Sequence, residues 1–403
     1  MTEFNPHIYF NQISEDSDYK NHLRTLANPL IQNQVPVLFT MGHLAHCAGV
    51  PYQYMKRVAS RTVDPYKVFP IKKRSGGKRY ICAPEPMLQQ MQRWIHDHIL
   101  YSSGSLCSIA AQATAFLPDT NHCVNAKRHL GAKWLIKIDI QDFFESISER
   151  QVYRVFRSFG YSSLVSFGLT RVCTRALYWQ DRRRTKKVKR WQSKTKYNFS
   201  NEFTVGYLPQ GAPTSPVLAN LVCRELDKNL SDLAAGSFLT YSRYADDMVF
   251  SGDFSDRSEA IEFLNRAIQV VTKQGFRINR LKTGIRKEGS RRVVTGLLVD
   301  GDKVRVPKQY KDQIKQELYY LEKFGVDDHC RRLSEKISQK YSKPATPKNK
   351  IAYLLRLSGK IRYVEFIEPQ NNTVIGFRET FNRLFPTVSQ LEPYIQGRYL
   401  HEQ

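Results

Sequence analysis

The fold of this 403-residue chain is decided by the stretch YSRYADDMVF, residues 241–250. Aromatic, aliphatic and β-branched residues on both sides favour strands, whereas the central Ala-Asp-Asp is too polar to continue a buried strand. We therefore predict a β-hairpin with two carboxylates, Asp246 and Asp247, at its turn. Adjacent like charges raise each other's pKa, and a divalent cation removes that cost because hard cations such as Mg²⁺ prefer carboxylate oxygens.

A third carboxylate stands about a hundred residues upstream, in the apolar stretch WLIKIDI (residues 134–140), which Asp139 interrupts. A buried charge is costly unless it is paired or bound to a metal. If Asp139 joins Asp246 and Asp247, the three can share two metal ions, an arrangement that stabilises the attacking and leaving oxygens of an in-line phosphoryl displacement. This is the chemistry of nucleotide polymerisation. The alternative is an ordinary solvated Asp-Asp turn, with Asp139 capping a helix.

Charge indicates the kind of partner. The chain has 62 Lys and Arg against 37 Asp and Glu, a net charge of +25. Such an excess suits a polyanion, either nucleic acid or an anionic membrane surface. The sequence favours nucleic acid, because no apolar run is long enough to span a bilayer and no secretory signal is visible at the N-terminus. Seven cysteines without a CxxC pair indicate reduced thiols, so we expect a cytoplasmic protein.

Two basic segments are candidates for phosphate contact. Residues 68–84 predict two short strands around Gly76-Gly77, with Lys73 and Arg79 among five cations near the turn, although a merely solvated hairpin is the alternative. Residues 181–200 form a basic insertion with interleaved aromatics, which suits phosphate contact and base stacking. A disordered solubilising insertion is the alternative there. The cations that we expect to bind nucleic acid are Arg182, Arg183, Arg184, Lys186 and Lys187.

Two further features complete the pattern. The stretch LPQGAPTSP (residues 208–216) is rich in proline and small residues, which predicts a fixed loop that another molecule can approach closely. Strands are expected at 275–279 and 291–299, with Lys282 between them. After Pro307 the chain becomes helical and basic.

Taken in order, these motifs resemble those of reverse transcriptases. Asp139 matches the first catalytic aspartate, LPQG its loop motif, YADD (residues 244–247) its YxDD box, and Lys282 the lysine of the following motif. The resemblance implies an α+β right-hand polymerase with fingers, a palm of antiparallel sheet and helices, and a helical thumb. We expect an N-terminal helical extension over 1–60, fingers and palm over 61–300, and the thumb with a C-terminal RNA-binding region over 301–403.

Within the family, two short signatures resemble those of retron reverse transcriptases. NAKRH (residues 125–129) is similar to the retron NAxxH motif, and VTG (residues 294–296) to the motif that follows the palm. The resemblance places Asn125, His129, Val294, Thr295 and Gly296 among the nucleic-acid-binding residues. Group II intron-like or other bacterial reverse transcriptases with different priming stay as alternatives.

The resemblance also implies roles for single residues. The three aspartates bind two Mg²⁺ ions, with Mn²⁺ as an alternative, and Lys282 is a candidate proton donor to the leaving pyrophosphate. Phe144 stands where the family has an aromatic gate against the ribose 2′-OH, which favours dNTPs. The remaining nucleotide-binding residues are Gln210, which seats the nucleotide, and Lys73 and Arg79, which contact the triphosphate.

The implied function is that of a retron enzyme in an anti-phage defence system. Such an enzyme copies part of a structured non-coding RNA into single-stranded DNA, primed from a guanosine 2′-OH of that RNA, and leaves branched RNA–DNA (msDNA). We expect a separate effector protein as a partner, and host RNase H to remove the template. The alternative outside enzymology is an RNA-binding scaffold with an inactive palm.

Overall fold

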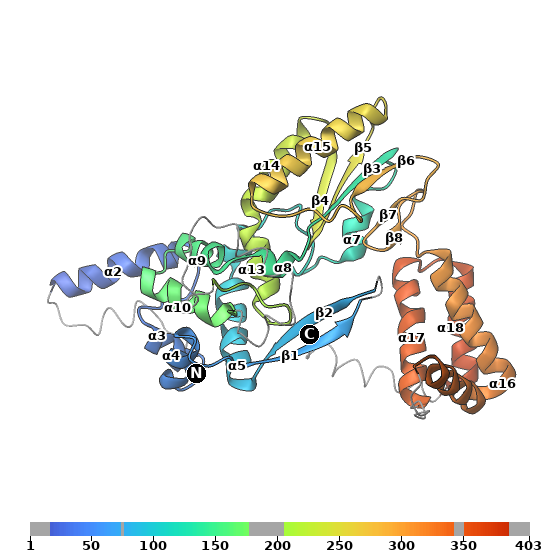
Figure 1. The fold of residues 1–403 in the computed structure, drawn as a ribbon, viewed down its shortest axis with the longest axis horizontal. Helices are drawn as coiled ribbons and strands as arrows, with labels where there is room; N and C mark the ends of the chain where they lie inside the picture. Colours follow the sequence, from blue (N-terminus) through green and yellow to red (C-terminus); the bar gives the residue numbers. More distant parts are fainter. Residues whose placement is uncertain (1–16, 74–75, 177–204, 342–349, 387–403) are drawn as a thin grey trace. The chain divides into compact units, whose positions relative to one another are not determined.

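The computed structural model describes residues 17–73, 76–176, 205–341 and 350–386. The chain forms two compact units, shown in Figure 1. The first unit comprises Met1–Asn125 and Lys133–Arg286, and the second comprises Ala126–Ala132 and Lys287–Gln403. The functional division into N-terminal extension, fingers, palm and thumb stays a prediction.

A four-stranded sheet forms the centre of the first unit. Its strand order is β4 (Thr240–Tyr244), β5 (Asp247–Gly252), β3 (Trp134–Asp139) and β6 (Gly284–Lys287), with β5 antiparallel to both β3 and β4. Most residues of β3 are buried, as its nearly continuous apolar sequence predicts. The expected segment 275–279 is not a full strand, because Ile278 makes a single bridge to Ile140 and the regular pairing begins only at β6.

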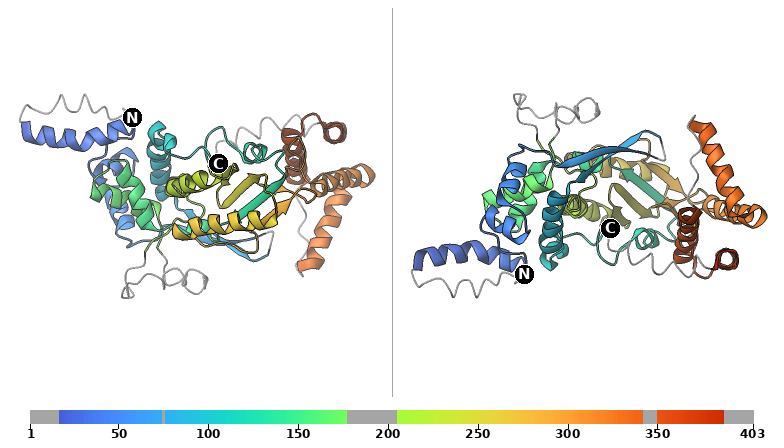
Figure 2. Two further views of the ribbon diagram at one scale, coloured as in Figure 1. Left: turned by 90° about the horizontal axis from the view of Figure 1, so that it is seen from above. Right: turned by 90° about the horizontal axis from the view of Figure 1, so that it is seen from below.

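Helices α14 (Arg224–Ala235) and α15 (Arg257–Lys273) pack on this sheet and on each other (Figures 1 and 2). Helix α15 is amphipathic, and its buried face contributes Phe263 to the core. The ring of Phe263 meets Phe250 of β5 edge to face at 5.1 Å, and Phe250 stacks on Tyr241 of β4 at 4.8 Å. These aromatic contacts hold the strands that carry the YADD box against the helical layer.

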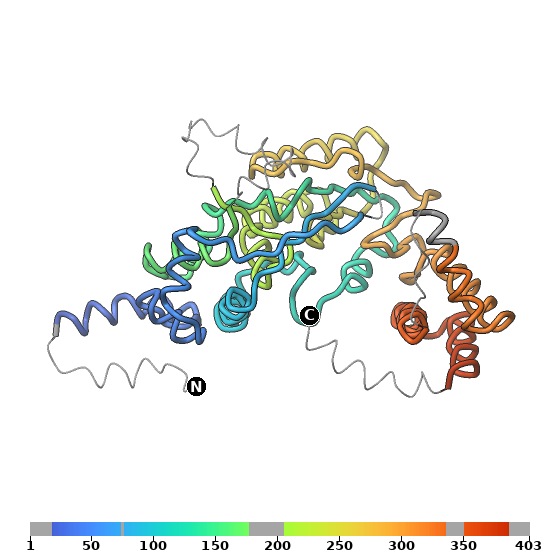
Figure 3. The backbone as a smooth tube through the Cα atoms, turned by 60° about the horizontal axis from the view of Figure 1, so that its bottom comes forward, coloured from blue at the N-terminus to red at the C-terminus, as the bar shows by residue number. Residues whose placement is uncertain are grey.

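The strands β1 (Tyr66–Lys72) and β2 (Lys78–Pro84) form the predicted basic hairpin. Figure 1 draws them as two paired arrows, and Figure 3 traces the same blue segments as a tube. Among the residues that the structure describes, the first unit also contains the helices α2 (Ser17–Gln32), α3 (Met41–Cys47), α4 (Tyr52–Ala59), α5 (Pro86–Trp94), the π-helix η1 (Ile95–Leu100), α6 (Ser103–Cys107), α8 (Phe143–Ser146), α9 (Glu149–Ser158), α10 (Ser163–Cys173) and α13 (Ser215–Val222). Helix α7 (His122–Lys127) spans a boundary between the units.

In its described residues, the second unit combines a small hairpin with three helices. Strands β7 (Val293–Val294) and β8 (Leu297–Leu298) are joined by Thr295-Gly296, whose φ angles of 47° and 85° are those of a two-residue turn with both residues left-handed. Helices α16 (Lys308–Tyr341), α17 (Lys350–Ile367) and α18 (Asn372–Leu384) pack on one another. Gly325, at φ 72°, interrupts the helical backbone of α16.

Within the described residues, no helix combines the length and the apolar character that a membrane crossing requires.

Candidate active site

The sheet brings the predicted carboxylates together. Asp139 is the last residue of β3 and lies directly opposite Asp247, the first residue of β5. Asp246 lies beside them in the β4–β5 turn, which contains only Ala245 and Asp246. Ala245 has a φ of 56°, the left-handed conformation that the first position of such two-residue turns requires. The hairpin and its two carboxylates are therefore as predicted.

The backbone around Asp139 is fixed on both sides. Its carbonyl accepts a hydrogen bond from the Asn279 amide at 2.8 Å, and its own amide donates to the Thr283 hydroxyl at 3.3 Å. The next amide, that of Ile140, donates to the carbonyl of Asp246 at 3.0 Å. Segments far apart in the sequence thus hold the carboxylates in register, and the loop that carries Lys282 is part of the same arrangement.

Two lysines neutralise these carboxylates. The ammonium of Lys282 lies 2.8 Å from Asp139 Oδ2, and that of Lys137 lies 2.8 Å from Asp247 Oδ2. The hydrogen bond to Asp139 raises the pKa of Lys282. Lys282 therefore carries a proton next to the site, as a general acid must.

The charged forms of the buried carboxylates Asp246 and Asp247 are still disfavoured in the folded protein. Burial, followed by repulsion from Asp139, raises the pKa of Asp246. Burial also raises the pKa of Asp247, although Lys137 opposes that shift. Among the described residues, Asp247 Oδ1 is enclosed by protein without a hydrogen-bond partner. A buried oxygen of this kind is costly unless something binds it.

These features fit a hard divalent cation. The donors are all carboxylate oxygens, and one of them is unsatisfied. A cation would offset the burial and the charge repulsion that raise the pKa values of Asp246 and Asp247. In the described parts of the chain, no group of three or more His, Cys, Asp or Glu side chains is arranged so that it could hold a metal ion. An open site of this type suits Mg²⁺, which is often held by one or two carboxylates together with substrate phosphates.

A buried ion pair supports the YADD turn. Arg243 is fully buried on β4 and forms a bidentate pair with the equally buried Asp227 of α14, at 2.7 and 2.6 Å. The same guanidinium donates to Asn220 Oδ1 at 3.0 Å and to the carbonyl of Ala245 at 3.2 Å. Tyr241 donates its hydroxyl to Asp227 at 2.9 Å. The turn with the predicted catalytic carboxylates is therefore anchored by a hydrogen-bonded polar network on β4 and α14.

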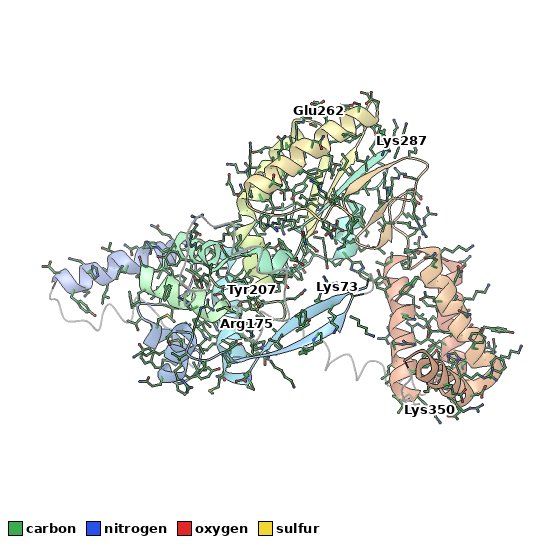
Figure 4. The ribbon with its side chains drawn as sticks, in the orientation of Figure 1. Lys73, Arg175, Tyr207, Glu262, Lys287 and Lys350 are labelled. Atoms are coloured by element: carbon green, nitrogen blue, oxygen red, sulfur yellow. The ribbon has the colours of Figure 1, made fainter. Side chains whose placement is uncertain are left out.

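The predicted gate residue lies just after Asp139. Phe144 is on the short helix α8, with its ring 5.4 Å from that of Phe143. Burial raises the pKa of the adjacent Glu145, and the positive charges of Lys73 and Arg79 oppose that shift. The tip of the β1–β2 hairpin, where Figure 4 labels Lys73, therefore acts electrostatically on helix α8. The two residues predicted to contact the triphosphate, Lys73 and Arg79, thus lie near enough to α8 to act on the residue next to the predicted gate, Phe144.

The LPQG loop is fastened to the same hairpin. The carbonyl of Gln210 accepts a hydrogen bond from the amide of Cys82 in β2 at 2.8 Å. Gly211 has a φ of 115°, and a Cβ there would lie 2.8 Å from Ile81 Cγ2 and 3.0 Å from the carbonyl oxygen of Cys82. Glycine is thus required by conformation and by space, which explains the loop motif. The side chain of Gln210 is partly exposed.

The two retron signatures are largely internal. The side chains of Asn125, His129 and Val294 are buried, whereas Thr295 is partly exposed and Gly296 exposed. Asn125 Oδ1 accepts a hydrogen bond from Thr114 at 2.7 Å. Burial lowers the pKa of His129 to about 3, so its imidazole is neutral. Direct contact of these residues with nucleic acid stays a prediction. In the β7–β8 hairpin, the turn residues Thr295 and Gly296 are the ones exposed enough to make such a contact.

The five predicted cations of the basic insertion, Arg182, Arg183, Arg184, Lys186 and Lys187, lie outside the described residues. Beside that segment, Arg175 and Tyr207 exchange backbone hydrogen bonds of 3.0 Å in both directions, and Figure 4 shows them adjacent. Arg175 also forms an ion pair with Asp64. These backbone hydrogen bonds hold Arg175 and Tyr207 next to each other.

Sequence reasoning missed Lys137 and the Arg243–Asp227 pair. Lys137 stands two residues before Asp139, so period-two alternation places both on one face of β3, and this was a usable signal. Arg243 lies within the decisive stretch itself, but nothing local indicates its partner. Asp227 is on another helix, and only the tertiary structure brings it close.

Comparison with known proteins agrees with the geometry. Residues 71–316 match the model of the reverse transcriptase (RNA-dependent DNA polymerase) family. The chain is 32% identical over 275 residues to the retron Mx162 reverse transcriptase of Myxococcus xanthus, covering 65% of this chain and 54% of that protein, so it spans about half of that relative.

Two proteins of Escherichia coli are similar over more of their length. The retron Ec86 reverse transcriptase is 28% identical over 290 residues, covering 71% of this chain and 79% of its own. The retron Ec73 reverse transcriptase is 31% identical over 315 residues, covering 71% and 85%. The helices and antiparallel sheet described above are those of a right-hand polymerase. The chain therefore belongs to the reverse transcriptases and, within them, to the retron reverse transcriptases.

Proposed function

We propose that this chain copies part of a structured non-coding RNA into single-stranded DNA in the cytoplasm, starting from a guanosine 2′-OH of that RNA. The product is branched RNA–DNA (msDNA). Further partners are dNTPs, host RNase H and a separate effector protein, within a system that defends against phage. The observation that carries this function is the direct pairing of Asp139 with Asp247 next to Asp246, in a chain whose relatives bear the names of retron enzymes.

Each residue of the site has a part in the proposed reaction. A hydroxyl group of the primer releases its proton to solvent, and its oxygen forms a bond to the α-phosphorus of a dNTP. The bond between that phosphorus and the bridging oxygen of pyrophosphate breaks. Lys282, whose ammonium lies beside Asp139, gives its proton to the leaving pyrophosphate. Phe144 excludes the ribose 2′-OH, Gln210 seats the nucleotide, and Lys73 and Arg79 contact the triphosphate.

Asp139, Asp246 and Asp247 are the residues that would hold two Mg²⁺ ions, or Mn²⁺ in their place. When bound, such ions stabilise the charge that develops on the attacking and leaving oxygens. The unsatisfied Oδ1 of Asp247 and the raised pKa values of Asp246 and Asp247 support this assignment.

The nucleic acid is held mainly through its backbone, as the charge of +25 favours. The proposed contacts are the basic insertion at 181–200, the two signatures at 125–129 and 294–296, and the helical region 301–403, which we expect to be the thumb. Recognition of an RNA–DNA duplex by such a unit depends on A-like shape rather than on base sequence. Substituting the five cations of the insertion together is expected to weaken RNA binding and to flatten its salt dependence, whereas an unchanged salt slope would remove the insertion from the interface.

The deciding experiment analyses the nucleic acid that co-purifies with the chain expressed from its own locus. It is run on a denaturing gel after treatment with RNase, DNase or a debranching enzyme. We expect a short DNA that survives RNase and shifts on debranching, and that is missing from an Asp246→Asn variant. Unbranched DNA would overturn priming from a 2′-OH. If the unaltered chain and the Asp246→Asn variant both co-purify with RNA and no DNA, the result would overturn polymerase function in favour of an RNA-binding scaffold.

A further inference from the structure

Phe116 has an unusual backbone conformation beside the proposed gate. Its φ is 62°, in the left-handed region that bulky side chains rarely adopt, and its side chain is 38% exposed. Strained conformations of this kind persist only where the surrounding structure imposes them, and they concentrate at functional sites. Neither the motifs nor the family resemblance assigned a role to this residue.

The segment that leads to Phe116 is fixed to the catalytic hairpin. Ala113 forms a parallel bridge with Arg243 of β4, and the amide of Thr114 donates to the Arg243 carbonyl at 2.9 Å. The side chain of Asn220, which is part of the Arg243 network, donates from Nδ2 to the carbonyl of Ala115 at 2.8 Å. These contacts hold the chain on the side that enters Phe116.

The Phe116 residue itself is held on its other side. Its carbonyl accepts a hydrogen bond from the Tyr101 hydroxyl at 3.1 Å. Thr114 is fixed further by donating its hydroxyl to Asn125, at 2.7 Å, so the first residue of the NAKRH signature supports this segment from within the core. The backbone of Phe116 is therefore determined from several directions, and its left-handed turn directs the ring.

The ring lies between two residues of the proposed active site. Its centroid is 6.2 Å from that of Phe144 and 6.5 Å from that of Tyr244, both in tilted geometry. These separations are within the range of favourable aromatic pairs. Phe144 follows Asp139 on α8, and Tyr244 is the first residue of the YADD box. Phe116 thus connects the gate to the catalytic hairpin by direct ring contact.

We propose that Phe116 is a positioning residue that holds the ring of Phe144 in place and so sets the discrimination between dNTPs and rNTPs. This inference rests on the proposed function of Phe144 as the gate. A gate excludes a 2′-OH only if its ring cannot rotate away, and Phe116 supplies one wall against such rotation. Without that wall, Phe144 acquires space to yield, and a ribonucleotide is accepted.

The experiment measures kcat/KM for dNTPs and for rNTPs in primer extension on an RNA template. It uses the full chain and the variants Phe116→Ala, Phe144→Ala, the double variant and Phe116→Tyr. The matched control is Phe238→Ala, because Phe238 has a similar φ of 55° but lies 95% exposed between α14 and β4. Both alanine variants change the backbone cost of a left-handed residue alike, so the two sites differ in the burial and the contacts of the ring.

We expect Phe116→Ala to raise rNTP use relative to dNTP use by about tenfold, which corresponds to about 1.4 kcal/mol of transition-state discrimination. The double variant should discriminate no worse than Phe144→Ala, because the wall acts only through the gate. Phe116→Tyr should retain discrimination, and Phe238→Ala should match the unaltered chain.

Several results would overturn the inference. If Phe116→Ala lowers kcat/KM for both sugars equally, the residue only stabilises the fold. If Phe144→Ala loses discrimination while Phe116→Ala keeps it, the gate stands without this wall. If Phe144→Ala keeps discrimination, the gate assignment falls and the role of Phe116 falls with it. If the unaltered chain makes no DNA, either from an added primer or from its own RNA, the proposed function is overturned instead.

Discussion

Asp139 and Asp247 are cross-strand partners in the central sheet, one at the end of β3 and the other at the start of β5. Directly opposed residues in an antiparallel pair have Cα atoms about 4.5–5.5 Å apart, so the two carboxylates are held close by the backbone itself. Lys282 and Lys137 each neutralise one of them. The backbone therefore holds these buried carboxylates close together, where their charges repel each other. Four predictions concern these carboxylates and the residues that pair with them.

The first prediction concerns Asp246, whose pKa is raised by burial and by Asp139. Asp246→Asn should lower DNA synthesis about a thousandfold or more, which corresponds to about 4 kcal/mol of transition-state stabilisation. In buffer with a chelator, the same change should raise the melting temperature, because a raised carboxylate pKa means that the charged form destabilises the folded state at neutral pH. Binding to the template RNA should be unchanged. A melting temperature that falls would show that the Asp246 charge is well compensated in the folded protein.

The second prediction concerns pH. Protons compete with a cation for Asp246 and Asp247, and both have pKa values above the ordinary 3.8. The apparent Mg²⁺ affinity should therefore begin to fall at a higher pH than for ordinary aspartates, and saturating Mg²⁺ should restore much of the rate. The measurement is a Mg²⁺ titration of primer extension at several values between about pH 8 and about pH 5. Identical Mg²⁺ dependence at every pH would contradict the raised pKa values.

The raised pKa values of Asp246 and Asp247 also make the stability of the protein in chelator depend on pH: Mg²⁺ affinity falls as the pH falls, whereas stability rises. Both groups bind protons more tightly in the folded chain than in the unfolded one. Their contribution to the free energy of unfolding is therefore greatest below the ordinary pKa and is lost as the pH rises through the raised values. Comparing denaturation of the unaltered chain and of Asp246→Asn across this window isolates the contribution of Asp246.

The third prediction concerns Lys137, whose side chain is 27% exposed and whose ammonium pairs with Asp247. Lys137→Met keeps the aliphatic stem but leaves a largely buried carboxylate without its counter-ion, so the chelated protein should lose about 1–3 kcal/mol of stability. Added Mg²⁺ should stabilise this variant more than the unaltered chain, because the cation replaces the missing charge. Chemical denaturation with and without Mg²⁺ measures both effects.

Lys133, four residues before Lys137, provides a matched control. Lys133 pairs with Asp253 at 3.2 Å, but both side chains are at least 60% exposed. Lys133→Met should change stability by less than about 1 kcal/mol and should show no Mg²⁺-dependent difference. Equal losses in the two variants would mean that the Lys137 pair is no more than a surface ion pair.

The fourth prediction concerns Arg243, which is fully buried against Asp227 and supports the Ala245 carbonyl. Arg243→Met leaves Asp227 buried without a partner and should destabilise the protein by about 3–5 kcal/mol. Arg243→Lys should also lose stability, because an ammonium cannot reproduce the bidentate pair together with the bonds to Asn220 and Ala245. Urea denaturation measures both losses.

The control for Arg243 is Arg305, which pairs with Asp300 at 3.0 Å but is 51% exposed. Arg305→Met should cost less than about 1 kcal/mol. If Arg243→Met proves as mild as this control, the buried network does not anchor the hairpin. The YADD turn would then be held by the strand ladder alone.

Much of the site was predictable because its signals are local. Paired aspartates between strand-forming residues predicted the hairpin, and an apolar run interrupted by Asp139 predicted a buried strand ending at a charge. The LPQG loop was also visible, since Gly211 needs a conformation that glycine alone adopts readily. The strand expected at 275–279 failed because its apolar residues pack without regular pairing, and Ile278 makes only one bridge.

The sequence alone indicated the family, predicted the three candidate catalytic carboxylates and gave the basic charge of the chain, because these depend on residue types and on their order along the chain. Only the folded chain decided which charges meet. Lys137 with Asp247, Arg243 with Asp227, and Phe116 with Phe144 are separated by between 16 and 110 residues. Such pairs arise from strand register and helix packing, and no local pattern encodes a distance across the sheet. The left-handed turn at Phe116 is likewise imposed by its neighbours in space, against its own preference.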